Sequence, residues 1–329
     1  MTIMSQAYSF NFCESLMAEN AGVSLKSTHF DVDAILKVYD SIKPLAVEFG
    51  VDAPRPRLAA FGYPHVVSLG APIEFPEDGE PNVFPFIKTP EEIDTLKEPE
   101  NYLAAPLIQA RLKIAAELGN CRKDAMSKFI GHALEGPITT AVLLMGQDFF
   151  TLVYDDPKRA HRLLNFCVES ALNYVQTLHM HFNGQTPVEP GPRGIPDDFA
   201  GMLPPELFGE FVVPYWNHIY DGLKTTERHL HSELLREEHL PFLRELNIKY
   251  YDPSADQYVT PQLLSKKCLC RFASCIQSWD MRDLSGDQLE KLYRNIAHCK
   301  PYVISFSMSA MSEFEKIKRL LRLARELEK

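Results

Sequence analysis

Apolar side chains recur at helical spacing in several long segments of this chain. One segment is Val32–Phe49, and Pro54 and Pro56 prevent its helix from continuing much further. In another, Asp156 and Pro157 supply a capping side chain and a proline at the first turn, as at the start of many helices. The same pattern predicts helices over Pro106–Leu118, Glu206–Leu223 and Leu234–Leu246, after Thr260-Pro261, around Leu289–Ile296, and after the Ser312-x-x-Glu315 capping box.

Short apolar stretches alternate with these helices in the second half of the chain, and we predict that they are strands. They are Lys128–Leu134, the stretch that carries His231, Ile248–Tyr251, Phe272–Ile276 and Tyr302–Phe306. Regular strand-helix alternation implies parallel strands in an open doubly wound sheet or in a closed (β/α)8 barrel. The chain has neither a G-x-G-x-x-G sequence nor a P-loop, which are the usual marks of open nucleotide-binding sheets.

Polar side chains follow the predicted strands, where a barrel builds its active site. We therefore predict an α/β protein in which residues 58–329 form a (β/α)8 TIM-type barrel and residues 1–57 form an N-terminal helical extension. The polar residues at the strand ends are Glu135, His231 with Glu233, Asp252, Gln277 and Ser307.

Composition and charge narrow the range of functions. The 329 residues are 45% hydrophobic and 24% charged, which is ordinary for a globular protein, and the formal net charge is -10. No stripe of lysines and arginines is present, so we expect no nucleic-acid partner. The chain starts without the basic region and apolar core of a signal peptide, and no apolar run approaches the ~20 residues that span a bilayer. We expect a cytoplasmic protein that does not bind membranes.

The seven cysteines are spread over the chain in an odd number, which indicates reduced thiols. Cys268 and Cys270 stand as C-x-C, a weak metal signal without a second pair. Cys275 ends a predicted strand and could face a cleft, although burial as a small hydrophobic side chain is the commoner outcome.

The segment Arg228-His229-Leu230-His231-Ser232-Glu233 carries the strongest candidate chemistry. It lies between two predicted helices, so it is most simply a strand, and side chains two apart on a strand share a face. His229, His231 and Glu233 would then point the same way at the carboxyl end of the strand. Two imidazoles and a carboxylate can hold a zinc ion or perform acid/base chemistry. Satisfied polar residues at a strand end are the alternative, and the spacing alone leaves both open.

Several segments carry a family resemblance. Glu135-Gly136-Pro137-Ile138-Thr139 resembles the G-P-F-T segment of the uroporphyrinogen decarboxylase superfamily, and the run Leu152–Leu164 after it is also similar. Asp197-Asp198 through Pro204-Pro205-Glu206-Leu207-Phe208 to Pro214 resembles the D-D…S-P-E-x-F-x-E-F-x-x-P signature of that superfamily. The likeness covers about residues 90–329 and implies a distorted barrel with a deep cleft at the carboxyl ends of the strands.

Two branches of this superfamily differ in their motifs. Uroporphyrinogen decarboxylases carry an M-R-Q-A-G-R loop whose arginines bind the substrate's carboxylates, and this chain has only Arg55-Pro56-Arg57 as its nearest basic pair. Some cobamide-dependent methyltransferases carry H-x-C-G and a distant cysteine in a zinc site. Here His231 stands where that first cysteine would be, and Ser307-Met308-Ser309 has no cysteine.

The resemblance therefore implies a methyltransferase that moves a methyl group from a small methylated ether or amine to a cobamide. The chain lacks the D-x-H-x-x-G motif of corrinoid-binding domains, so the cobamide should arrive on a partner corrinoid protein. We predict a zinc site of nitrogen and oxygen ligands that acts as a Lewis acid. The predicted ligands are His231, Glu233 and Asp252; the predicted catalytic residues are His231, Glu233 and Asp197; and Asp198 and Glu135 are predicted to contact the cofactor.

Three points stay open at this level. One of the adjacent residues Asp197 and Asp198 could cap backbone amides while the other binds substrate or cofactor. Asp252 precedes a proline and could belong to a turn. The alternative functions are a decarboxylase-like enzyme acting on a porphyrin-related carboxylate and a non-catalytic binding barrel. The protein could also be a homodimer.

Overall fold

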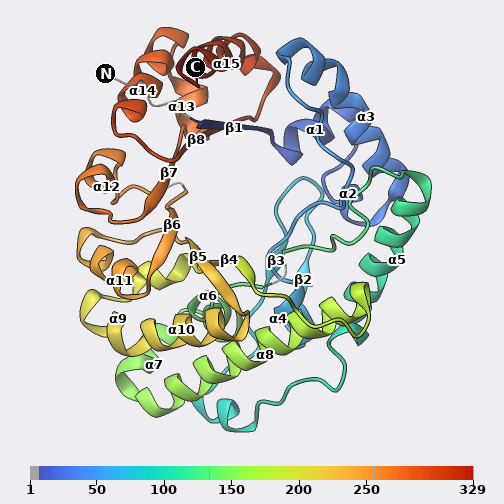
Figure 1. Cartoon of the computed structure of the whole chain (residues 1–329). Coiled ribbons are helices and arrows are strands. Elements are labelled where there is room, and N and C mark those ends of the chain that lie inside the picture. Colours follow the sequence, from blue (N-terminus) through green and yellow to red (C-terminus); the bar gives the residue numbers. More distant parts are fainter. Residues whose placement is uncertain (1–6, 133, 255, 329) are drawn as a thin grey trace.

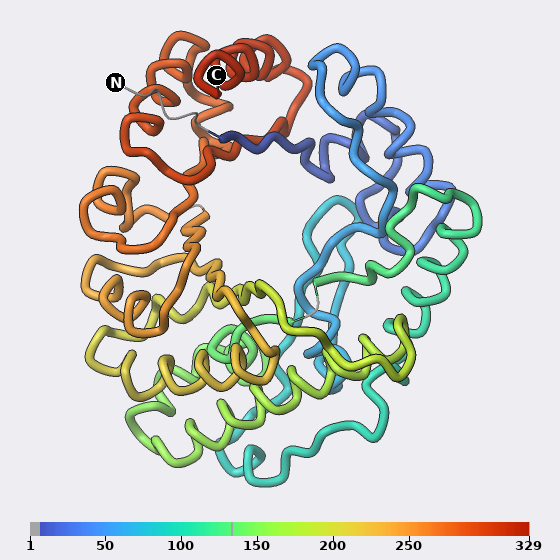
Figure 2. Tube along the Cα trace, viewed as in Figure 1, coloured from blue at the N-terminus to red at the C-terminus, as the bar shows by residue number. Residues whose placement is uncertain are grey.

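Strands line the inside of a ring and helices cover its outside (Figure 1). The computed structural model describes residues 7–132, 134–254 and 256–328. Figure 2 shows the same ring as a tube, in which the first described strand lies beside the last helix.

Six strands form one parallel sheet that curls along part of the ring, in the order β1-β8-β7-β6-β5-β4. Because every strand runs the same way, all their carboxyl ends lie on one face of the ring. The strands are β1 (Ala7–Phe12), β4 (Gly191–Pro196), β5 (Thr225–His231), β6 (Ile248–Asp252), β7 (Arg271–Cys275) and β8 (Val303–Met308). The strands β2 (Ile73–Glu74) and β3 (Asn82–Val83) form a separate antiparallel pair.

Helices follow the strands along the chain and pack on the outer side of the sheet (Figure 1). Among the described residues, none of them has both the length and the apolar character needed to cross a membrane. They are α1 (Glu14–Ala21), α2 (Ser27–Phe30), α3 (Val32–Phe49), α4 (Pro64–Ser68), α5 (Pro106–Cys121), α6 (Pro137–Met145), α7 (Asp148–Asp155), α8 (Pro157–Asn183), α9 (Pro205–Phe211), α10 (Val213–Gly222), α11 (Leu240–Glu245), α12 (Pro261–Lys267), α13 (Ser278–Asp283), α14 (Gly286–His298) and α15 (Phe314–Glu328). Short 3-10 turns are η1 (Pro90–Thr95), η2 (Tyr102–Ala104), η3 (Asp198–Met202), η4 (Glu237–His239) and η5 (Met311–Glu313).

Several helix signals in the sequence correspond to helices in the structure. The helix predicted over Leu234–Leu246 is wrong in its first half, because α11 begins only at Leu240, after the turn η4. The helix predicted over Val32–Phe49 is confirmed with the same bounds, and it ends at Gly50 in the left-handed conformation. The side chain of Asp156 accepts from the amide of Arg159 at 3.1 Å, and that of Thr260 accepts from the amide of Leu263 at 3.2 Å, so both predicted caps are present.

The Ser312-x-x-Glu315 capping box is wrong. Glu313 takes that role, because its carboxylate accepts from the amides of Ser309 at 2.7 Å and Ala310 at 3.3 Å. A 3-10 turn therefore comes first, and α15 begins at Phe314. The box in the structure runs from Ala310 to Glu313, two residues earlier than predicted.

The N-terminal segment is not wholly helical. Residues 7–12 form β1, which pairs with β8 from Ala7↔Val303 to Phe12↔Met308. The alternation of Tyr8, Phe10 and Phe12 with smaller side chains is a strand pattern. The helical preface predicted for residues 1–57 therefore begins only after this strand, and the first strand of the sheet comes from the chain's start.

The strand predicted over Lys128–Leu134 is also wrong, because the described residues of that stretch form turns and bends. Gly131 has φ 132°, in the region that favours glycine, and a Cβ there would lie 2.7 Å from the ring of Pro64. Residues 56–62, 128–132 and 134–136 cross the remaining arc of the ring as irregular segments (Figure 1). The described residues thus show a curled six-stranded sheet, and not a complete eight-stranded barrel.

Isolated hydrogen bonds join these irregular segments to their neighbours. The amide of His132 donates to the carbonyl of Phe61 at 3.0 Å, and the amide of Gly136 donates to the carbonyl of Pro196, at the end of β4. The amide of Ala59 donates to the carbonyl of Thr28 at 3.2 Å. Single bonds replace the ladder that a strand would provide.

Arg111, on α5, ties the two irregular segments together and is fully buried. Its guanidinium donates to the carbonyls of Ile130 and Ala59, each at 2.7 Å, and lies 4.4 Å from the ring centre of Phe61. Its third contact is Nδ1 of His29, at 3.2 Å. Burial, followed by the charge of Arg111, lowers the pKa of His29 to about 4, so the imidazole is neutral and can accept this bond.

Arg111→Met should destabilise the protein by about 3 kcal/mol or more, because two buried carbonyls and an imidazole nitrogen would lose their donor. Urea unfolding of the full chain measures this change. The matched control is Arg122→Met at the end of the same helix, where the ion pairs with Asp40 and Asp124 are exposed and the loss should be much smaller. Equal losses in the two variants would contradict the role given to Arg111.

Candidate active site

The side chains that the sequence singles out lie at the carboxyl ends of three neighbouring strands. Pro196 of β4 pairs with His231 of β5, and His231 pairs with Asp252 of β6. Asp197 and Asp198 follow β4 directly. One cross-strand row therefore brings an imidazole and several carboxyl groups to the same face of the ring.

His231 lies between two carboxyl groups. Its Nδ1 is 3.1 Å from Oδ2 of Asp252, within hydrogen-bonding distance, and its Nε2 is 3.5 Å from Oδ1 of Asp198. The three side chains keep between 37% and 39% of their surface exposed, so a substrate can reach them. Asp252 is fixed in turn, since its Oδ1 accepts from the amide of Ser254 at 3.0 Å.

The electrostatics of this group favour a protonated imidazole. The hydrogen bond with Asp252 is the largest cause that raises the pKa of His231, burial opposes it, and the charges of Asp198, Asp252 and Glu233 add to it. Burial raises the pKa of Asp252, but its hydrogen bonds with His231 and Ser254 outweigh this and leave the pKa below its usual value. His231 and Asp252 thus form an imidazolium-carboxylate pair.

Asp198 is the weaker of the two partners. Burial raises its pKa and outweighs the attraction of His231, and the nearby charges of Glu233 and Asp252 raise it further. In a tight ion pair the pKa of the carboxyl group would fall, whereas the pKa of Asp198 rises. This agrees with the longer distance of 3.5 Å between Asp198 and His231. We therefore assign the orientation of the ring to Asp252.

Asp197 has a structural place and not the catalytic one that the sequence suggested. It is fully buried, and its carboxylate accepts from the amide of Thr139 at 2.7 Å and from the indole nitrogen of Trp216 at 2.6 Å. Burial raises its pKa to about 6, and these bonds oppose the rise. Of the two adjacent aspartates, Asp197 caps backbone amides at the start of α6 and Asp198 faces His231.

Glu135 lies close enough to Asp198 and Asp197 for their charges to act on it. Burial is the largest cause that raises its pKa well above the usual value, and the charges of Asp198 and Asp197 add to it. Gly62 makes room for it, since a Cβ there would lie 2.0 Å from Oε1 of Glu135. A neutral Glu135 can donate a hydrogen bond, which is compatible with its predicted role in binding.

Glu233 does not share a strand face with His231, because β5 ends at His231. The chain turns after the strand, and Leu234 has a positive φ of 62°. The charge of Glu233 is among the smaller causes that raise the pKa of His231, so it lies close to the pair. Ser232, which sequence reasoning missed, fixes the turn: its hydroxyl donates to the carbonyl of Asp197 at 2.8 Å.

The predicted ligand set of His231, Glu233 and Asp252 does not form a metal centre. Among residues 7–132, 134–254 and 256–328, no group of three or more His, Cys, Asp or Glu side chains is placed to hold a metal ion. Asp252 binds the imidazole directly, and Nε2 faces Asp198. Zinc binding therefore stays a prediction.

Two further candidates have other partners. Nε2 of His229 lies 3.1 Å from Oε1 of Glu227, which is two residues earlier on β5. The thiol of Cys275 donates to the carbonyl of Ser254 at 3.0 Å, and burial raises the pKa of the thiol to about 12. Neither side chain joins the row at His231.

The sequence profile of the uroporphyrinogen decarboxylase (URO-D) family matches residues 2–268 of the chain. The chain belongs to this family. No curated protein sequence matches it closely enough to add a relative.

Solved structures that resemble the chain include a methyltransferase and a putative methionine synthase. A methyltransferase from Methanosarcina mazei is 13% identical with a TM-score of 0.68, and the match covers 98% of this chain and 93% of that one. A putative vitamin-B12 independent methionine synthase from Listeria monocytogenes is 11% identical with a TM-score of 0.47, over 98% and 96% of the two chains. The first likeness shows a shared fold, and the second is too distant to support an argument.

Close packing of two loops holds Asp198 in place. A Cβ on Gly201 would lie 2.4 Å from the carbonyl carbon of Leu234 and 2.6 Å from the carbonyl oxygen of Glu233. Gly201→Ala should therefore push these loops apart and cost about 1–3 kcal/mol, measured by thermal or urea unfolding. Gly209→Ala in α9 is the control, because its Cβ would meet only Phe242 at 3.8 Å, and it should be neutral or stabilising. No loss in Gly201→Ala would show that the loops are not packed as described.

Proposed function

We propose that the chain is a methyltransferase that moves a methyl group from a small methylated ether or amine to the cobalt of a cobamide on a partner corrinoid protein. The observation that carries the proposal is the imidazole of His231, held at the carboxyl end of the sheet by Asp252 and faced by Asp198. Membership of the URO-D family supports it, and so does the shared fold with a protein named as a methyltransferase.

The chemistry needs an acid at this place. When the bond between the methyl carbon and the substrate oxygen breaks, its electron pair stays on the oxygen, which is a poor leaving group until it gains a proton. The imidazolium of His231 supplies that proton from Nε2, while Asp252 keeps the ring oriented through Nδ1. The cobamide, carried by the partner protein, would supply the nucleophile that accepts the methyl group, and His231 regains a proton from solvent.

The charge of the site favours this proposal over a decarboxylase-like function. Most of the titratable groups near His231 are acidic. Asp198, Asp252 and Glu233 act on it directly, Glu135 lies near Asp198, and His132 is the basic group among them. A porphyrinogen carries many carboxylates and would need cations to bind them. Arg57, from the nearest basic pair in the sequence, is 3.0 Å from Glu14 and is thus already paired. We therefore expect no efficient turnover of uroporphyrinogen.

His231→Asn should lower kcat for methyl transfer by about 10²–10⁴-fold, because the departing atom would lose its proton donor. The assay follows free cob(I)alamin with a panel of methoxyarenes and methylamines. His229→Asn is the matched control on the same strand, because His229 pairs with Glu227, and its rate should stay near the wild-type value.

Retention of the wild-type rate by His231→Asn would contradict the assignment. Absence of transfer with every substrate of the panel, with strong porphyrin binding, would favour the decarboxylase-like alternative. Metal analysis of the purified protein completes the test: a stoichiometric metal lost together with activity on chelation would support zinc in place of the acid described here.

The pH dependence gives a second test. Because the hydrogen bond with Asp252 raises the pKa of His231 above 6.5, the imidazolium persists to higher pH than in a free imidazole and is lost as the pH rises through the raised value. The rate should fall on the alkaline side, and Asp252→Asn should move that fall to lower pH. An unchanged profile in Asp252→Asn would remove Asp252 from the account.

A further inference from the structure

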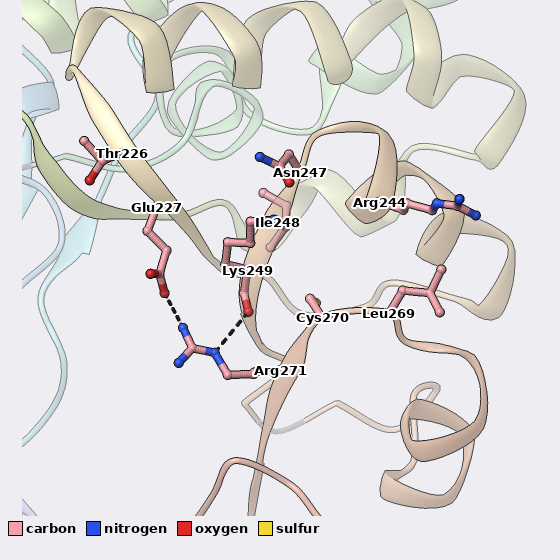
Figure 3. A pocket seen from close by; sticks show the side chains of 9 residues that line it. All are labelled: Thr226, Glu227, Arg244, Asn247, Ile248, Lys249, Leu269, Cys270 and Arg271. Carbon is pink, nitrogen blue, oxygen red and sulfur yellow. Dashed lines mark hydrogen bonds and ion pairs between the residues drawn. The ribbon is translucent and has the colours of Figure 1, made fainter.

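A second candidate site lies at the opposite end of the strands, away from His231. An open cavity of about 570 Å³ is formed by the amino ends of β5, β6 and β7 and the turns before them (Figure 3). This volume is in the range of small-molecule sites. Its walls are Thr226, Glu227, Arg244, Asn247, Ile248, Lys249, Leu269, Cys270 and Arg271.

The cavity is basic, although the whole chain has a net charge of -10. Arg244, Lys249 and Arg271 are three positive charges against the single negative charge of Glu227. Glu227 is paired with Arg271, as the dashed line in Figure 3 shows, and also with His229. Arg244 and Lys249 are therefore left to attract an anion.

A pair of thiols stands at the wall of this cavity. Cys270 lines the cavity, and its sulfur is 3.3 Å from that of Cys268. Leu269 between them is 72% exposed, whereas the two cysteines are partly buried and keep some exposed surface. The C-x-C sequence gave a weak metal signal, but no three-ligand group includes these thiols among the described residues.

The two thiols are electrostatically unequal. The hydrogen bond between the two thiols is the largest cause that lowers the pKa of Cys268, to about 7. The same bond raises the pKa of Cys270. Cys268 is then the nucleophile near neutral pH, and Cys270 is the thiol that resolves its product.

We propose that Cys268 and Cys270 are a reactive dithiol that exchanges with anionic low-molecular-weight disulfides bound in the basic cavity. The Cys268 thiolate attacks one sulfur of the disulfide, and the other sulfur leaves as a thiolate that takes up a proton. The Cys270 thiol then loses its proton and attacks the Cys268 sulfur, which releases the second thiol. One disulfide is reduced to two thiols, and the two cysteines are oxidised to one disulfide. The site is independent of the reaction at His231.

Oxidised glutathione is the probe, because it is a disulfide with several carboxylates. Incubated with the reduced full-length protein, it should remove two thiols and give a Cys268–Cys270 link in peptide mass mapping, reversible by dithiothreitol. Cys270→Ser should stop at a mixed disulfide on Cys268. Cys121→Ser, which removes an exposed cysteine outside the cavity, should leave the reaction unchanged.

The cavity itself is tested with the double variant Arg244→Gln, Lys249→Gln. Its rate with oxidised glutathione should fall about threefold or more, while its rate with the uncharged bis(hydroxyethyl) disulfide stays unchanged. Equal slowing with both disulfides would overturn the role of the cavity. Persistence of free thiols at Cys268 and Cys270 while Cys121 reacts would overturn the proposal altogether.

Discussion

The buried carboxylate of Asp197 holds the candidate site together. It accepts from the start of α6 and from Trp216 on α10, and the backbone of Asp197 is bonded to His231 and Ser232. Gly136 is needed beside it, since a Cβ there would lie 2.3 Å from its side chain. The ends of β4 and β5 are thereby fixed relative to each other. The distance between Asp198 and His231 follows from that constraint, although Asp197 itself takes no part in the chemistry.

The two sides of the ring are stabilised by different kinds of hydrogen bonding. On one side, six strands share hydrogen-bond ladders, and the polar row at His231 lies where the ladders end. On the other side, irregular segments depend on single bonds and on Arg111. Glu135 comes from the irregular side, and the charge of Asp198 acts on its carboxyl group. The site therefore combines an imidazole and carboxylates set by strand register with a carboxyl group set by side-chain contacts.

Much of this could be predicted from local pattern. Helical spacing and cap residues gave α3 and the start of α8, and the strand-end rule placed His231 and Asp252 beside each other. Three features could not be predicted from local pattern. The strand β5 ends at His231, so Glu233 lies beyond it. Asp197 is buried, which leaves Asp198 to face His231. The hydrogen bonds of Arg111 join residues from three distant parts of the chain, so a pattern within a short stretch of sequence cannot reveal them.

The central claim is that His231 is held as an imidazolium by Asp252. The most direct measurement is an NMR titration of the imidazole nitrogens of His231 in the intact protein, compared with Asp252→Asn. The account predicts a midpoint above the ordinary 6.5 in the wild type and a lower midpoint in the variant. A wild-type midpoint at or below 6.5, unchanged by the substitution, would contradict it.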